Sequence, residues 1–338
     1  MLKQAAALGL ALTLLPLSLS AQADGEVNVY SYRQPFLVKP LFEAFTDQTG
    51  IDVNVVFAKT GIAERLKREG RNSPADVVMT VDVARLSDLA ERDLTQSVHS
   101  ETISNNIPPS FRHPDGKWIG LTSRARIIYA SKERVKKGEI KTYEGLADPR
   151  WKGKACTRSA KHPYNVALIA SMIAHHGIDG AEDWLRGVKA NLARKPQGND
   201  RAQVKAIKEG ICDVALGNSY YYGKMLTNED QKAWAESAFL VFPNQDGRGT
   251  HVNISGAALT KSTPNREEAI KLLEFLSSEK AQQIYAETNF EHPVNPDVTP
   301  TGLVAEWGDF KVDDLPLQKI ADYREEAVKL VDRVGFDN

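Results

Sequence analysis

Residues 210–225 read GICDVALGNSYYYGKM, and this stretch places consecutive aromatic residues at the end of a strand. Residues 214–216 form a short apolar run bounded by glycines, which is typical of a buried strand. Asn218 and Ser219 are residue types that favour a helix N-cap, so we expect Tyr220, Tyr221 and Tyr222 where the strand passes into a helix. In open α/β sheets ligands bind at such junctions. The stretch is therefore a candidate binding site.

Neighbouring phenols at that position have two interpretations. A phenolate is a hard, anionic oxygen donor of the kind that a small, highly charged cation such as ferric iron prefers, and tyrosine ligates iron in some haem proteins. Because an unperturbed phenol titrates near about pH 10, a strong cation must displace its proton. The other interpretation is a packed aromatic cluster, and the motif alone leaves both open.

Length and composition indicate an ordinary globular protein. The chain has 338 residues, of which 42% are hydrophobic and 26% charged, which fits two domains or one large one. The formal net charge of −1 leaves no basic excess, so we expect no nucleic-acid partner.

The first 23 residues are predicted to be a secretory signal peptide. Lys3 provides a basic start, residues 5–19 are apolar, and Ala21-Gln22-Ala23 resembles a cleavage site. We expect the mature chain to begin at Asp24 and to be exported. No later segment approaches the length needed to cross a membrane.

Two cysteines, Cys156 and Cys212, follow in the mature chain. In an exported protein an even count is compatible with a disulfide, but two cysteines carry no framework signal. Each opens an apolar stretch, so the two could lie on adjacent strands. Bridged and free thiols both remain open, and a metal site made of them is not expected.

Strand and helix patterns alternate along the rest of the chain, which predicts an α/β fold with mostly parallel sheets flanked by helices. Strand patterns cover residues 27–30, 53–57, 76–80, 118–131, 214–216 and 251–260, with another near Cys156. Helix patterns cover residues 37–49, 62–70, 83–92, 166–176, 181–193, 200–209, 267–277, 279–287 and 317–334. The run at 118–131 is longer than an ordinary strand, so we expect it to cross between two lobes, with residues 251–255 as the return crossover.

Five stretches together resemble the periplasmic ferric-ion-binding proteins, which are the substrate-binding components of iron(III) ABC importers. They are VNVYSYRQ at 27–34, NSPADVV at 72–78, GLTSRAR at 120–126, NSYY at 218–221 and HVNISGAA at 251–258. The resemblance covers nearly the whole mature chain and implies the two-lobed class II periplasmic binding protein fold. We expect lobe one to comprise residues 24–125 with 251–300, and lobe two residues 126–250 with 301–338, with the cleft between them.

The resemblance implies an iron(III) ion held by Tyr220 and Tyr221, and by Tyr164 as in a tyrosine-rich subgroup. Other members have a histidine where this chain has Gln34 and a glutamate where it has Val81. Those two ligands therefore cannot be carried over.

A small anion is expected beside the metal, because three phenolates balance the charge of Fe(III) but leave coordination positions open. In the family a carbonate or phosphate fills them. The resemblance implies that Arg124 or Arg126 binds this anion together with Ser159 and Asn218. A planar guanidinium suits an oxyanion, so the chemistry is also plausible on its own.

Three further residues are expected to support the site without ligating the ion. Gln34 and His162 are predicted to lie at the cleft mouth or to face solvent. Arg33 could assist the anion or pair with a carboxylate, and both alternatives remain open.

Other polar and aromatic residues are predicted to be structural. Tyr222 follows the tyrosine pair on a helix and should point elsewhere, into packing. His175 and His176 end a helix before Gly177, which suits a helix C-terminus rather than a metal site.

These patterns predict a monomeric, periplasmic Fe(III)-binding protein that delivers iron to an inner-membrane ABC importer permease. We expect no enzyme activity, because the sequence shows no nucleophile elbow, zincin helix, phosphate loop or dinucleotide fingerprint. One rival is a binding protein of the same fold for a small organic or oxyanion solute, which ligand screening would identify. The other is an exported enzyme that uses tyrosine as acid or base, which predicts turnover.

Overall fold

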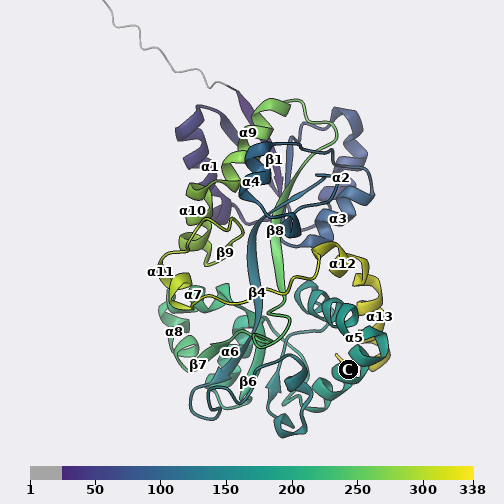
Figure 1. Cartoon of the computed structure of the whole chain (residues 1–338), viewed down its shortest axis with the longest axis vertical. Coiled ribbons are helices and arrows are strands. Elements are labelled where there is room, and N and C mark those ends of the chain that lie inside the picture. The colour runs from purple at the N-terminus through teal and green to yellow at the C-terminus, as the bar shows by residue number, and fades with distance from the viewer. Residues whose placement is uncertain (1–24) are drawn as a thin grey trace, which may run out of the picture.

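The computed structural model describes residues 25–338, so the predicted signal peptide lies outside the described residues. The chain forms two lobes along the long axis of the molecule, with two strands running between them (Figure 1). The strands are β1 (Glu26–Ser31), β2 (Asp52–Phe57), β3 (Val77–Thr80), β4 (Ile119–Ser131), β5 (Ala155–Cys156), β6 (Val214–Asn218), β7 (Ala238–Val241), β8 (Val252–Leu259) and β9 (His292–Pro293).

Thirteen α-helices surround these strands in the described part of the chain. They are α1 (Pro35–Thr49), α2 (Ile62–Glu69), α3 (Val83–Glu91), α4 (Glu101–Asn106), α5 (Pro163–Ala190), α6 (Asp200–Lys208), α7 (Tyr220–Leu226), α8 (Glu229–Glu236), α9 (Arg266–Ser277), α10 (Glu279–Asn289), α11 (Gly302–Glu306), α12 (Leu317–Asp322) and α13 (Arg324–Val334). A search of residues 25–338 finds no helix with the length and hydropathy of a membrane span.

The sheet runs in the order β2-β1-β3-β8-β4-β6-β5, and β7 and β9 also pair with β4. The predicted two-lobed α/β fold with two connecting strands is confirmed. The sheet is mixed rather than mostly parallel: β1 runs parallel to β2 and β3, and β5 parallel to β6, whereas all pairings of β4 and β8 are antiparallel. The difference arises because the two crossing strands run in opposite directions and pair with each other and with their neighbours.

Strand β4 connects the two lobes by changing its pairing partner midway (Figure 1). Its residues up to Ala125 pair with β8, and those from Arg126 onward pair with β6. All 13 of its residues are buried, which explains the continuous strand pattern in the sequence. The change of partner divides its side chains between two environments.

Separate apolar cores hold the helices on each lobe. Phe45 of α1 and Leu272 of α9 pack with Val29 in one core. Leu168 of α5 and Leu330 of α13 belong to another. Each lobe thus buries an apolar helix face, the main source of its stability.

Two predicted helices between residues 166 and 193 appear as the two parts of α5, which is interrupted at Gly177. This glycine has φ 72° and ψ 175°, a conformation that other residues rarely adopt. His175 and His176 end the first part, as predicted, and their Nε2 atoms lie 2.7 Å from carboxylates of Asp313 and Glu144. The predicted tail helix is likewise divided, into α12 and α13.

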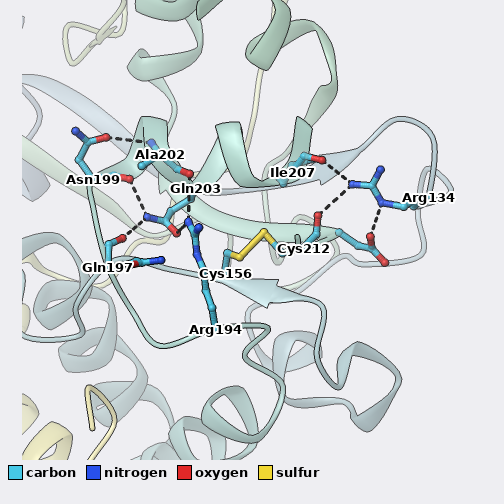
Figure 2. The surroundings of a disulfide bond; sticks show 10 residues. Arg134, Cys156, Arg194, Gln197, Asn199, Ala202, Gln203, Ile207 and Cys212 are labelled. Carbon is cyan, nitrogen blue, oxygen red and sulfur yellow. Dashed lines mark hydrogen bonds and ion pairs between the residues drawn. A yellow bond between two sulfur atoms is a disulfide. The ribbon is translucent and has the colours of Figure 1, made fainter. Parts of the chain in front are cut away.

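Cys156 and Cys212 form a disulfide, which settles the question left open by the sequence (Figure 2). Cys156 lies on β5 and Cys212 just before the parallel neighbour β6, with their Cα atoms 5.9 Å apart. Arg134 donates to the carbonyl oxygens of Ile207 and Cys212 at 2.7 and 3.1 Å. The turn entering β6 is therefore fixed by a covalent link and a guanidinium.

Candidate metal site

The β6–α7 junction lies against β4, but it is not capped as predicted. Ser219 already has helical angles (φ −55°, ψ −44°), and its side chain makes no capping hydrogen bond. Instead, the Ser219 N–H donates to the carbonyl of Ala125 at 2.9 Å, and the Tyr129 hydroxyl donates to the carbonyl of Asn218 at 2.7 Å. These two bonds to β4 fix where Tyr220 begins the helix.

Three phenols converge in one cleft at this junction. Tyr164 is the second residue of α5, and its hydroxyl oxygen lies 3.4 Å from that of Tyr220. The rings of Tyr220 and Tyr221 have centroids 4.2 Å apart and planes 35° apart. All three line a cleft of about 740 Å³. The structure therefore brings together the three predicted metal-binding residues.

Positive charge dominates the cleft walls. Its lining includes the cations Arg33, Arg124, Arg201 and Lys224, and a single carboxylate, that of Glu291. Such surroundings favour anionic oxygen atoms, whether phenolates or a bound oxyanion. Elsewhere, residues 25–338 contain no cluster of three or more His, Cys, Asp or Glu side chains arranged to hold a metal ion.

Burial keeps the phenol protons in place when no cation is bound. It raises the pKa of Tyr220 well above the ordinary value, and the neighbouring phenols of Tyr164 and Tyr221 add to the shift. Burial and then Tyr164 raise the pKa of Tyr221 to about 12. Both phenols are neutral near pH 7, so only a strongly charged ion can displace their protons.

Arg124 borders the cleft, as predicted for an anion-binding residue. It donates to Ser255 Oγ at 3.0 Å, to the Ile254 carbonyl at 2.8 Å and to the Val81 carbonyl. Its guanidinium carbon lies 5.9 Å from the centre of the Tyr164 ring. The side chain is thus held between the crossing strands and the phenols.

Arg33 pairs with a carboxylate, one of the two alternatives left open by the sequence. Its Nη2 lies 3.1 Å from an oxygen of Glu291, and both side chains are buried. Thr122 donates to the same carboxylate at 2.6 Å. Burial acts to raise the pKa of Glu291, but Arg33, Arg124 and the Thr122 hydrogen bond outweigh it and hold the pKa below the ordinary value. Sequence reasoning missed Glu291, which belongs to no motif.

Arg126 does not line the cleft, where an anion-binding residue is expected. Its Nη1 donates to Asp200 at 2.6 Å and to Asn218 Oδ1 at 3.0 Å, and its Nη2 donates to Asn165 at 2.6 Å. Arg126 lies where β4 pairs with β6, and its guanidinium is buried in the interior of that lobe. Its hydrogen bond also occupies the Asn218 side chain, which lies outside the cleft lining.

Ser159 lies outside the cleft lining as well, since its hydroxyl donates to Asp337 at 2.5 Å. Gln34 is exposed and lines the cleft. His162 is the N-cap of α5 and accepts a hydrogen bond from the Tyr164 N–H at 3.3 Å. Burial, with help from Arg158, lowers the pKa of His162 to about 4, so a neutral imidazole holds the helix start.

Tyr222 and Lys224 occupy different environments on α7. The Tyr222 ring lies 6.4 Å from that of Tyr129 and 6.3 Å from that of Trp307, outside the cleft, as the packing prediction requires. Lys224 lines the cleft and donates to the carbonyl of Thr288 at the end of α10, at 2.9 Å. No sequence motif pointed to Lys224.

A cleft between two α/β lobes joined by crossing strands defines the class of two-lobed solute-binding proteins. Residues 72–308 match the family described as bacterial extracellular solute-binding protein, and the chain belongs to that family. The similarity to ferric-ion-binding proteins inferred from the sequence is also confirmed.

The similarity to several proteins whose names mention iron extends over almost the whole chain. Iron uptake protein A1 of Synechocystis is 46% identical over 314 residues, 92% of this chain and 87% of that protein. Ferric iron-binding protein A of Mannheimia haemolytica, in an open conformation, is 53% identical with a TM-score of 0.89, covering 93% of this chain and 99% of that one. The Trichodesmium protein (IdiA, FutA) in complex with iron and citrate is 43% identical with a TM-score of 0.89, covering 92% and 100%.

Proposed function

We propose that this protein binds Fe(III) in the cleft through the phenolates of Tyr164, Tyr220 and Tyr221 and delivers it to an ABC importer in the inner membrane. The observation that carries the proposal is the convergence of three phenols from two helices, with the hydroxyls of Tyr164 and Tyr220 3.4 Å apart. Hard oxygen donors suit a small trivalent ion. The iron-binding relatives and the solute-binding family support the same function.

A small anion such as carbonate completes the coordination in this proposal. Three phenolates neutralise Fe(III), and the cations of the cleft leave room for further negative charge. Arg124 is the residue we assign to the anion, because it borders both the cleft and the Tyr164 ring. Arg126, Ser159 and Asn218 do not line the cleft and are not part of this assignment.

The proposal also covers the location of the protein and its division into two lobes. Residues 1–23 would direct the chain to the periplasm, where the protein acts as a monomer. Lobe one would comprise residues 24–125 with 251–300, and lobe two residues 126–250 with 301–338. The partner change of β4 after Ala125 supports this division.

Visible absorption of the iron-loaded protein tests the proposal. Apoprotein mixed with ferric citrate should become orange to red through charge transfer from phenolate to iron. Tyr220→Phe should lose most of the colour, whereas Tyr222→Phe, with the neighbouring ring outside the cleft, should keep it. A colourless mixture with no heat of binding in calorimetry would refute the iron assignment.

A thermal-shift screen separates this function from binding of another solute. Iron should raise the unfolding temperature, because a ligand bound only by the folded state stabilises it. Stabilisation by small anions and none by iron would instead indicate an oxyanion-binding protein, which the cationic cleft would also suit.

A further inference from the structure

Resting on the proposed iron function, we propose that Asp200 is a positioning residue for the three phenols. It lies at the start of α6 and lines no part of the cleft. Its carboxylate connects the segment that carries Tyr164 to the strand end that carries Tyr220 and Tyr221. The connection passes through Arg126.

On the side of the tyrosine pair, Asp200 binds the backbone directly. Its Oδ2 accepts from the Asn218 N–H at 3.0 Å, two residues before Tyr220. The same oxygen accepts from Arg126 Nη1 at 2.6 Å, and that Nη1 also donates to the Asn218 side chain at 3.0 Å. Asn218 is thus held by both members of the ion pair.

On the Tyr164 side, the connection runs through the next residue in the chain. Arg126 Nη2 donates to Asn165 Oδ1 at 2.6 Å. The Asn165 amide in turn donates to Thr157 Oγ1 at 3.0 Å and to the carbonyls of Arg158 and Ser159 at 3.1 Å. The loop that leads to Tyr164 is therefore fixed to the ion pair at several points.

Arg158 closes the network. Its Nη1 lies 3.3 Å from Asp200 Oδ1, and its guanidinium carbon lies 5.5 Å from the centre of the Tyr164 ring. Both oxygens of Asp200 are thus paired with an arginine, and the carboxylate is 0% exposed. The Nε atoms of Arg126 and Arg158 have no partner in the described part of the chain, but the Nη atoms and both carboxylate oxygens do, and buried hydrogen bonds of this kind restrict the geometry of the groups they join.

Breaking the network should weaken iron binding, as the loss of supporting groups does at other metal sites. Removal of a group that orients a ligand typically weakens metal binding about 10- to 100-fold. Asp200→Asn keeps the side-chain volume but loses the charge that pairs with Arg126 and Arg158. We therefore expect the variant to bind iron with displaced phenols.

Asp213 provides a matched control in the same lobe. It precedes β6, whereas Asp200 contacts the far end of that strand, and it pairs with Arg134 Nε at the same distance of 2.6 Å. Asp213 lines no part of the cleft. Asp213→Asn therefore removes an ion pair of equal length at the opposite end of β6 from the tyrosines, although this pair is more exposed than that of Asp200 with Arg126.

The experiment follows loss of the phenolate–iron absorption band after iron-loaded protein is mixed with excess EDTA. Asp200→Asn should transfer iron about 10- to 100-fold faster than the wild type and should shift the absorption maximum. Asp213→Asn should retain the wild-type rate and maximum. Transfer by Asp200→Asn at the wild-type rate with an unshifted band would overturn the proposal.

A double variant separates positioning from loss of stability. Asp200→Asn leaves Arg126 buried without its charge partner, which is costly, whereas removing both charges is often nearly neutral for stability. Asp200→Asn combined with Arg126→Met should recover part of the loss in the urea midpoint of the apoprotein, since Arg158 still lacks its carboxylate partner, but should keep the fast iron transfer and shifted band. Recovery of wild-type iron retention together with stability would contradict positioning. Absence of any band in wild-type protein would instead refute the iron function on which the inference rests.

Discussion

Lowering the pH by one unit near neutrality should weaken the apparent affinity for Fe(III) about a thousandfold, because each ligating phenol must lose a proton. The pKa of Tyr220 lies well above its ordinary value and that of Tyr221 is about 12, so both phenols hold their protons throughout this range. Each proton displaced contributes a factor of ten per pH unit, or about 1.4 kcal/mol. With three phenols the effect is about 4 kcal/mol per unit, and its sign favours binding at higher pH.

The assay is competition against a chelator of known pH-dependent affinity for Fe(III), followed through the phenolate–iron band at fixed carbonate. A plot of the logarithm of affinity against pH should have a slope of about three between about pH 6 and pH 7.5. Tyr221→Phe should reduce that slope to about two. A wild-type slope of one or less would mean that at most one phenol is deprotonated, and the three-phenolate site would have to be abandoned.

Three other predictions concern the fold and the walls of the cleft. Replacing both Cys156 and Cys212 by alanine should lower the free energy of unfolding by about 4 kcal/mol in urea titrations, because the bridge closes a loop with a sequence separation of 56 and so reduces the entropy of the unfolded chain. An unchanged urea midpoint would show that the bridge does not reduce that entropy measurably. Arg124→Gln should retain iron less well when carbonate is scarce, and equal loss at all carbonate concentrations would exclude an anion role. Tyr222→Phe should leave the iron slope and colour unchanged, so bleaching would place that phenol in the site.

The sequence identified the phenols because two of them are adjacent and follow a recognisable strand. Tyr164 lies 56 residues before Tyr220, and no local pattern joins the two. The resemblance supplied that residue, and the fold brings the first turns of α5 and α7 close enough for the two hydroxyls to lie 3.4 Å apart. The length of its strand pattern also identified β4 as a crossing strand, and the structure buries all 13 of its residues.

The charges around the phenols could not be predicted in the same way. The strand pattern does not show which residues of β4 line the cleft, because Arg124 lies where β4 pairs with β8 and Arg126 where it pairs with β6. The partners of Arg126 lie 74 and 39 residues away in the sequence, at Asp200 and Asn165. Glu291 likewise reaches the cleft through a tertiary contact, the short pairing of β9 with β4. Such contacts leave no periodic signal.

All three phenols belong to the side of the molecule that carries the disulfide. The opposite wall supplies Arg33, Glu291 and the separate phenol of Tyr32, but none of the three proposed ligands. In the proposed site, separation of the two walls would therefore expose the iron without stretching any bond between iron and phenolate oxygen. Opening alone would not release iron from such a site, and release would need a chemical step: protonation of the phenolates, reduction of the metal, or competing oxygen ligands in the importer.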